Sequence, residues 1–218
     1  MRGEHAIVAF DFDGTLTRRD TLLPFLARLA GPWALARALA RQAPALARAA
    51  AGADDARDAA KERLVRTLLA GLDASEVRAA GDAYGRRLAR RAVRSAVAER
   101  LRAHRDAGDT VVVVSASLDA YLEPACAALG VDAVVCSRLE VDAAGHLTGR
   151  LVGGNCRGPA KVVRLVEHPG ADAPLAWAYG DSHGDRELLA RAEHPVRVPR
   201  WPRPARLPAL DDRPRPRR

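Results

Sequence analysis

Short apolar runs separated by helix-like stretches dominate the second half of the chain. The run at 110–114 (TVVVV) predicts a strand, because β-branched residues suit a pleated surface. The run at 5–10 (HAIVAF) ends abruptly at Asp11, which is typical of a buried strand. We expect further strands at 133–136 and 175–179, a hairpin formed by 139–142 and 147–152, and helices at 118–129, 160–166 and 185–192.

Strands that alternate with helices indicate an α/β fold, in which helices cover a mostly parallel sheet. The stretch at 21–107 interrupts this pattern. It is rich in Ala, Leu and Arg and lacks β-branched runs, which favours four or five helices. We therefore expect a core formed by 1–18 and 93–197, a helical cap inserted at 19–92, and an irregular Arg/Pro-rich tail at 198–218.

Charge changes this picture only at the end of the chain. The formal net charge of +8 invites a nucleic-acid or membrane partner. However, residues 197–218 hold eight Arg and two Asp, a net charge of +6, so residues 1–196 carry only +2. We therefore expect a nearly neutral domain with a basic tail, and nucleic acid is not expected as its main partner.

Composition excludes several classes of protein. Hydrophobic residues make up 48% of the chain, so it is not wholly disordered, and the 4% of aromatic residues predicts an aliphatic core. Three cysteines without a CxxC motif predict neither a disulfide framework nor a zinc ribbon. No window approaches ~18 uncharged apolar residues, and the first residues lack a signal-peptide pattern. We expect a soluble, cytoplasmic protein without a transmembrane segment.

Candidate chemistry gathers where three predicted strands end. Asp11 and Asp13 follow the first strand, Ser115 follows the second, and Asp181 and Asp185 follow the last. Ligands of open α/β sheets bind beyond the carboxyl ends of the strands, so these side chains are expected to converge. Converging carboxylates repel one another unless a cation lies among them, and hard oxygen ligands suit Mg²⁺.

Two further side chains complete a predicted phosphate site. Ser115, expected to begin a helix, can offer its hydroxyl and neighbouring amides to phosphate oxygens. Lys occurs only at Lys61 and Lys161, against 33 Arg. A Lys retained at position 161, near the start of a predicted helix, indicates a site that requires a compact charge rather than a guanidinium fork.

Four motifs occur in a fixed order: DFDGT, VVVVSAS, GPAKVVRL and YGDSHGD. Together they resemble the haloacid dehalogenase superfamily of phosphohydrolases. The helical insertion directly after the first motif is similar to that of the phosphoserine-phosphatase-like subgroup, subfamily IB. The resemblance extends from about Ala6 to Arg197 and implies a Rossmann-like core, a helical cap and Mg²⁺ as the cofactor.

The resemblance also implies roles for individual residues. Asp11 resembles the nucleophile that forms an aspartyl-phosphate, and Asp13 resembles the general acid/base that protonates the leaving alcohol. Asp13 argues for phosphate chemistry, because the true dehalogenases lack this second aspartate. The implied metal ligands are Asp11, Asp13 through its carbonyl, Asp181 and Asp185, and the implied phosphate binders are Gly14, Thr15, Ser115, Ala116 and Lys161.

Departures from the subgroup concern the substrate. The chain has Ser115-Ala116-Ser117 where phosphoserine phosphatases usually show SGG, and Gly184 where they usually place Asn. Asp20 takes the place of a cap carboxylate that would hold an amine, or else it caps a helix. Arg63 or Arg57 could hold a carboxylate, or else lie on a solvated helix face. His183 is not expected to be a metal ligand. Asn155 and Cys156 are expected to be structural or else to border the entrance to the site.

The sequence therefore predicts a Mg²⁺-dependent phosphomonoesterase that acts on a small, phosphoserine-like metabolite through an aspartyl-phosphate. One alternative is a lipid head-group phosphatase, similar to those acting on phosphatidylglycerophosphate, that works at the membrane surface. The stretch at 33–50 favours it, because Arg37, Arg41 and Arg48 alternate with Leu35, Leu39 and Leu46 in a basic amphipathic pattern. The same pattern fits a bundle helix that faces the core. A nucleic-acid-binding module using the basic tail is a weaker alternative.

Overall fold

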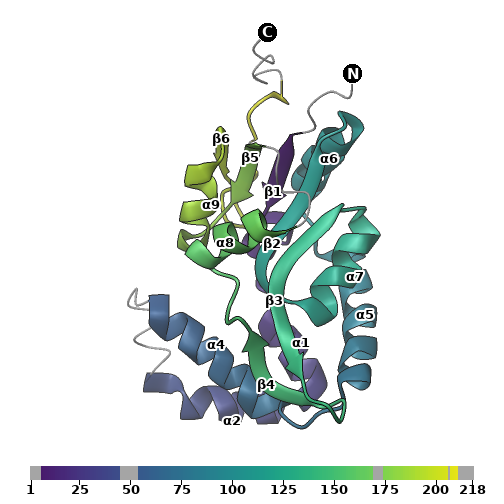
Figure 1. Ribbon diagram of the computed structural model, residues 1–218, viewed down its shortest axis with the longest axis vertical. Helices are drawn as coiled ribbons and strands as arrows, with labels where there is room; N and C mark the ends of the chain where they lie inside the picture. Colours follow the sequence, from purple (N-terminus) through teal and green to yellow (C-terminus); the bar gives the residue numbers. More distant parts are fainter. Residues whose placement is uncertain (1–5, 45–53, 169–173, 206, 211–218) are drawn as a thin grey trace.

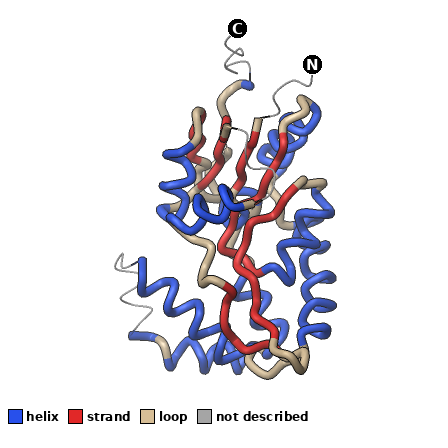
Figure 2. Tube along the Cα trace, in the orientation of Figure 1, coloured by secondary structure: helices blue, strands red, loops and turns tan. Residues whose placement is uncertain are grey.

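The structure is a computed structural model that describes residues 6–44, 54–168, 174–205 and 207–210. Its centre is a six-stranded sheet of order β4-β3-β2-β1-β5-β6 (Figures 1 and 2). All neighbouring strands are parallel except β3 and β4, which are antiparallel. The strands are β1 (Ile7–Phe10), β2 (Thr110–Leu118), β3 (Ala133–Val141), β4 (Leu147–Val152), β5 (Leu175–Gly180) and β6 (His194–Arg197).

Side chains of the central strands point alternately to the two faces of the sheet, and both faces are buried. Val8 and Phe10 of β1 belong to one core cluster, whereas Ile7 and Ala9 belong to the other. Successive side chains of a strand point to opposite faces, so a strand buried on both faces must be apolar throughout. The helices that complete these layers are α6 (Ser95–Asp106) and α7 (Asp119–Leu129) on one face, and α8 (Pro159–Glu167) and α9 (Arg186–Arg191) on the other. The predicted α/β fold is confirmed.

Helices α1, α2 and α4, which follow β1 in the chain, lie at one end of the molecule (Figure 1). There α4 packs on β4, and α5 packs along α7. A Cβ atom on Gly81 would lie 2.1 Å from the carbonyl oxygen of Ala120, so only glycine permits this close crossing of α5 and α7. The helices in the predicted cap range are α1 (Leu22–Ala30), α2 (Pro32–Arg41), α4 (Asp54–Leu69) and α5 (Ala74–Arg91).

Several predicted boundaries are wrong. The segments at 133–136 and 139–142 form one strand, β3, whose far half pairs with β4. Strand β2 continues to Leu118, so Ser115 lies in a strand and does not begin a helix. The predicted helix at 33–50 ends at Arg41, and Leu46 and Arg48 lie outside the described residues. Strand β6 was not predicted at all.

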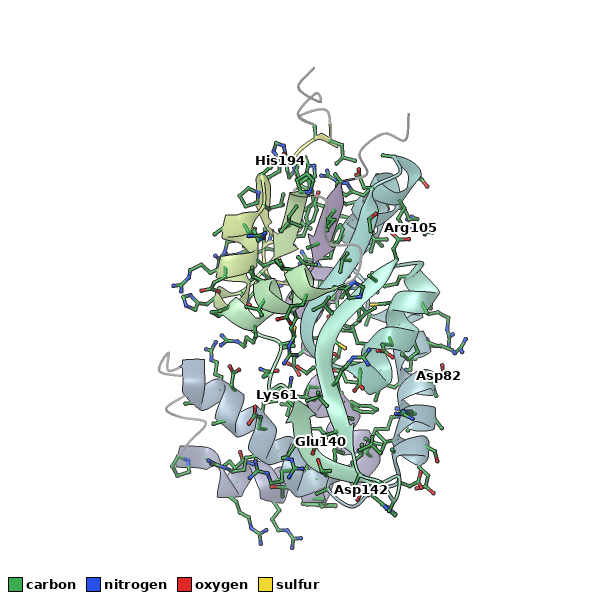
Figure 3. All side chains as sticks on the ribbon, viewed as in Figure 1. Lys61, Asp82, Arg105, Glu140, Asp142 and His194 are labelled. Atoms are coloured by element: carbon green, nitrogen blue, oxygen red, sulfur yellow. The ribbon has the colours of Figure 1, made fainter. Side chains whose placement is uncertain are left out.

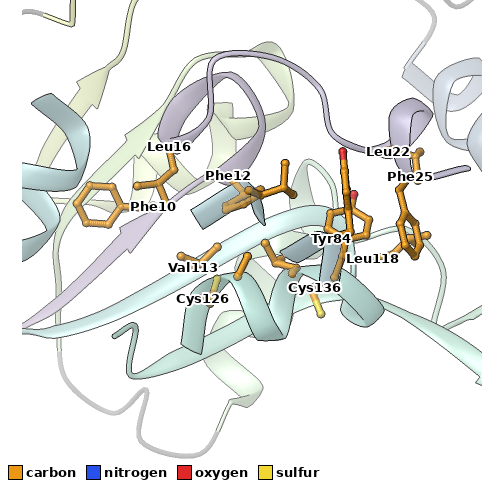
Figure 4. Packing of buried hydrophobic residues seen from close by; sticks show 14 of the residues in the cluster. Phe10, Phe12, Leu16, Leu22, Phe25, Tyr84, Val113, Leu118, Cys126 and Cys136 are labelled. Atoms are coloured by element: carbon orange, nitrogen blue, oxygen red, sulfur yellow. The ribbon is translucent and has the colours of Figure 1, made fainter. Parts of the chain in front are cut away.

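The core contains more aromatic packing than the composition predicts. The rings of Phe10 and Tyr179 stack with their centroids 4.3 Å apart. The ring of Phe25 packs against those of Tyr84 and Tyr121. Every Phe and Tyr of the chain is buried, so a few aromatic side chains support the largely aliphatic core (Figure 4). Within the described residues, no helix is both long and apolar enough to cross a bilayer.

Candidate active site

Three buried carboxylates meet at the ends of β1 and β5. The backbone N–H of Asp11 donates to the carbonyl of Tyr179 over 2.9 Å, which brings the residues after β5 beside Asp11. Asp11, Asp181 and Asp185 offer ligand atoms that lie within 4.8 Å of one another. The prediction that parallel strand ends bring these residues together therefore agrees with the geometry.

Lys161 joins two of the three carboxylates. Its Nζ lies 2.6 Å from Oδ1 of Asp11 and 2.5 Å from Oδ1 of Asp185, and all three side chains are buried. Burial acts to lower the pKa of Lys161, but the two carboxylates outweigh it and raise that pKa above its usual value. Burial also raises the pKa of Asp11 to about 7, with Asp185 and Asp181 adding to the rise and Lys161 opposing it. The ammonium therefore stays charged and partly neutralises the acidic group.

The donor set fits a hard divalent cation. Oδ1 of Asp181 is buried and has no hydrogen-bond partner, which is a costly state for a carboxylate oxygen. Asp11 and Asp185 supply further carboxylate oxygens, and Mg²⁺ prefers oxygen ligands of this kind. Gly14 allows its own backbone to lie close to the carboxylate of Asp181, because a Cβ at this position would lie 2.6 Å from Oδ2. Its φ of +86° also favours glycine.

The carboxylate of Asp13 is held by hydroxyl groups. Oδ2 accepts from Oγ of Ser117 over 2.7 Å, and Oδ1 accepts from Oγ1 of Thr21 over 2.7 Å. Burial raises the pKa of Asp13 to about 7, Asp20 adds to the rise, and the two hydroxyls oppose it. Thr21 is fixed in turn by Tyr84, which donates to its carbonyl oxygen. A carboxyl group with a pKa near neutrality can give and take protons.

Of the remaining predicted phosphate binders, three line the pocket and one does not. Ser115 and Ala116 line the pocket at the end of β2, as Gly14 does beside Asp11. Thr15 is fully buried, does not line the pocket, and its hydroxyl has no hydrogen-bond partner. Ser117, which the sequence marks only as a departure from SGG, contacts Asp13. Its spacing of two from Ser115 on a strand places both on the same face and could have indicated this role.

A pocket of about 500 Å³ opens over these groups. Asp20 lines it, and its Oδ1 also accepts from the N–H groups of Leu22 and Leu23 at the start of α1. Both interpretations of Asp20 are therefore compatible with the structure.

Arg57 lines the pocket, whereas Arg63 is exposed on α4 and does not line it. His183 is exposed and is not part of the acidic group.

The family model of the haloacid dehalogenase-like hydrolases matches residues 8–190. The chain belongs to this family. Protein CicA of Caulobacter vibrioides is 38% identical over 194 residues, covering 88% of this chain and 86% of its own length.

Two solved structures support this assignment at the level of the fold. A Bordetella pertussis Tohama I protein, described as having unknown function, matches with a TM-score of 0.74 and 27% identity over 91% of this chain and 92% of its own. A phosphoserine phosphatase, solved as a phospho-aspartyl intermediate analogue, matches with a TM-score of 0.59 and 21% identity over 90% and 86%.

In this hydrolase, Lys61 is a site residue that sequence reasoning missed. It lies on α4, on the side that faces the strands (Figure 3). Its Nζ donates to the carbonyl oxygen of Ala116, to Oδ1 of Asn155 over 2.5 Å and to Oγ of Ser137 over 3.2 Å. Asn155 also donates to Asp58 over 2.7 Å, which joins α4 to the loop before α8. Asn155 and Lys61 both line the pocket. The scarcity of Lys that indicated Lys161 applies equally to Lys61.

Replacing Lys61 with Met is expected to lower the free energy of unfolding by about 1–3 kcal/mol, because three acceptors lose their donor in a partly buried site. Burial lowers the pKa of Lys61 to about 8, and Asp13 and Asp58 act against the shift, so the bridge is charged at neutral pH. Urea denaturation measures the change. The matched control is Arg63→Met on the exposed side of the same helix, where a change within about 0.5 kcal/mol is expected. Equal effects of the two variants would contradict this assignment.

Proposed function

We propose that this protein is a Mg²⁺-dependent phosphomonoesterase that works through an aspartyl-phosphate on Asp11. The observation that carries the proposal is the buried group of Asp11, Asp181, Asp185 and Lys161, in which one carboxylate oxygen lacks a partner. Asp13, held two residues from Asp11, supplies the second carboxyl group that such chemistry needs.

The first half of the reaction transfers the phosphoryl group to the enzyme. A carboxylate oxygen of Asp11 forms a bond to phosphorus while the bond from phosphorus to the substrate oxygen breaks. The departing oxygen takes the electron pair of the broken bond and receives a proton from the carboxyl group of Asp13. An alcohol leaves, and Asp13 is then a carboxylate.

The second half releases phosphate. Asp13 takes a proton from a water molecule, and the water oxygen forms a bond to the phosphorus of the aspartyl-phosphate. The bond from phosphorus to the Asp11 oxygen breaks, and its electron pair returns to the carboxylate. Ser117 and Thr21 can donate to the Asp13 carboxylate or accept from its protonated form, so they support both states.

The proposed ligands of Mg²⁺ are the side chains of Asp11, Asp181 and Asp185 and the backbone carbonyl of Asp13. When bound, the ion neutralises charge on the phosphoryl oxygens and so lets an anionic carboxylate approach phosphorus. On the protein side, Lys161 provides a buried positive charge toward the same group. Ser115 and the backbone of Ala116 and Gly14, which line the pocket, are the further proposed phosphate binders.

The pocket supports a small substrate with charged groups beyond its phosphate. Asp20 and Arg57 both line it, so an amine and a carboxylate could each find an opposite charge, as in phosphoserine. The phosphoserine phosphatase among the solved structures shares this fold. We further propose that the helices at 19–92 act as a cap that excludes bulk water and selects the substrate. The reducing cytoplasm is the proposed compartment, because Cys126, Cys136 and Cys156 are free thiols.

One observation supports a second candidate, a phosphatase of lipid head groups. Trp33, at the start of α2, is 86% exposed, and Arg37 and Arg41 are exposed on the same helix. An exposed Trp beside cationic side chains is typical of contact with a membrane surface. However, Leu35 and Ala38 of α2 are buried against the other helices, so this helix also serves the bundle.

A panel of phosphomonoesters, assayed for released phosphate, tests the proposal. We expect turnover with Mg²⁺ and none after chelation, with small substrates such as phosphoserine preferred over a phosphorylated lipid in vesicles. Preference for the lipid, with co-sedimentation of protein and vesicles that Trp33→Ala weakens, would favour the second candidate. No turnover of any phosphomonoester in the presence of Mg²⁺ would contradict both.

A further inference from the structure

The chain beyond β6 forms part of the active-site wall. The backbone N–H of Val198 donates to the carbonyl of Gly180 over 2.8 Å, and Val198 is buried. Residues 198–203 have no helix or strand, as expected of the tail, but they pass beside the acidic group. Arg200 and Trp201 both line the pocket. The basic tail therefore begins inside the site and not beyond it.

A buried guanidinium fixes this segment in place. Arg94, which precedes α6, donates to the carbonyl of Pro199 over 2.7 Å and to that of Arg203 over 3.0 Å. The same side chain donates to the carbonyl of Gly14 over 3.1 Å. Arg94 thus ties the segment to the loop that carries Asp13 and Gly14. Three charge-assisted hydrogen bonds from one rigid group leave little freedom for either partner.

Asp181 lies between the two parts that Arg94 joins. Its Oδ2 accepts from Nε of Arg200 over 2.7 Å, and Gly14 packs against the carboxylate group as a whole. Its Oδ1 is the buried oxygen without a partner. The two oxygens of one carboxylate therefore have different surroundings. One is used by the protein, and the other is left for a ligand.

We propose that Arg200 is a positioning residue that orients Asp181 so that its Oδ1 faces the cation. This inference rests on the proposed Mg²⁺ site. Partners in the outer shell of a metal site fix the orientation of the ligands that touch the ion. Arg200 suits this task because its Nε gives a directed hydrogen bond, whereas the rest of its side chain is largely exposed and does not fill the site.

The alternative effect of Arg200 has the opposite sign. A positive charge 2.7 Å from a metal ligand repels a divalent cation, so an Arg that acted only through its charge would weaken Mg²⁺ binding. Removing it would then tighten binding. A positioning role predicts that removal weakens binding, because the carboxylate gains freedom to turn its free oxygen away. The direction of the change separates the two effects.

Calorimetric titration of Mg²⁺ into the chelator-treated full chain tests the proposal without any assay of turnover. We expect Arg200→Ala to raise the Kd for Mg²⁺ by about 10- to 100-fold, and Arg200→Lys to recover part of the loss. The matched control is Arg203→Ala, which removes the same charge from the same segment but leaves its backbone carbonyl available to Arg94. We expect that variant to bind Mg²⁺ as the wild type does.

The outcomes can be separated. An Arg200→Ala Kd equal to or lower than that of the wild type overturns the positioning role, as does an equal loss in Arg203→Ala. Failure of the wild-type protein itself to bind Mg²⁺ overturns the proposed function instead. Because the Arg200 side chain is 69% exposed, the variants are expected to fold, and thermal melting without metal should match the wild type.

Discussion

Replacing Asp11 with Asn is expected to lower kcat by about 10⁴-fold or more, as removal of a catalytic nucleophile does elsewhere. The amide is nearly isosteric but cannot attack phosphorus, so no aspartyl-phosphate forms. Asp11 is buried at the end of the central strand, and its Oδ1 contacts Lys161. Steady-state kinetics measure the loss, and acid quenching of the reaction measures phosphate bound covalently to the protein.

The Asp11 test needs a control for a simple loss of charge. Asp82→Asn makes the same chemical change on the exposed side of α5, where Asp82 pairs with Arg86. It should leave kcat within about two-fold of the wild-type value, since a surface pair contributes little. Covalent phosphate on the Asp11→Asn protein, or turnover near the wild-type rate, would show that another group is the nucleophile.

Replacing Asp13 with Asn is expected to lower kcat by about 10²- to 10⁴-fold for an alkyl phosphate, the usual range for loss of a general acid or base. The leaving group determines whether the substitution slows formation of the phosphoenzyme or only its hydrolysis. An alkoxide needs the proton from Asp13, whereas p-nitrophenolate leaves with little help. With p-nitrophenyl phosphate we therefore expect the phosphoenzyme to form readily in this variant and then to accumulate, because no base activates water.

Rapid-quench kinetics separate the two steps. A burst of p-nitrophenol followed by slow turnover is the expected signature of Asp13→Asn. Equal losses for the alkyl and the aryl phosphate, without a burst, would assign Asp13 a structural role only. The same Asp82→Asn protein serves as the reference, because it carries the same substitution far from the hydroxyls of Ser117 and Thr21.

The acidic group could be anticipated because its geometry follows from strand topology. Parallel pairing of β1 with β5 places whatever follows Phe10 beside whatever follows Gly180, so Asp11 and Asp181 meet without any knowledge of side chains. Lys161 could be anticipated for another reason, since the chain keeps Lys at only two positions and uses Arg everywhere else. The first inference uses the order and direction of the strands, and the second uses the composition of the whole chain.

Other parts of the site depend on long-range packing and left no local signal. Strand β6 contains Pro195 and two polar residues, a pattern that argues against a central strand but is tolerated at the sheet edge, where β6 lies. Arg200 resembles the other arginines of the tail and differs from them only in where Arg94 and β6 place it. Of the two arginines predicted as alternatives on α4, Arg57 lines the pocket and Arg63 does not, because the sequence alone does not fix which face of a helix meets the site.

The central place of β1 in the sheet has a consequence for synthesis on the ribosome. Its four residues are fully apolar and buried, and among the residues that the structure describes they pair with β2, which begins at Thr110, and β5, which begins at Leu175. The nascent strand therefore emerges long before either neighbour exists, whereas the helices after it can form from local contacts. Until Leu175 has left the exit tunnel, Ile7–Phe10 lacks at least one of its two neighbouring strands, so conditions that slow elongation should favour its capture by chaperones or by other nascent chains.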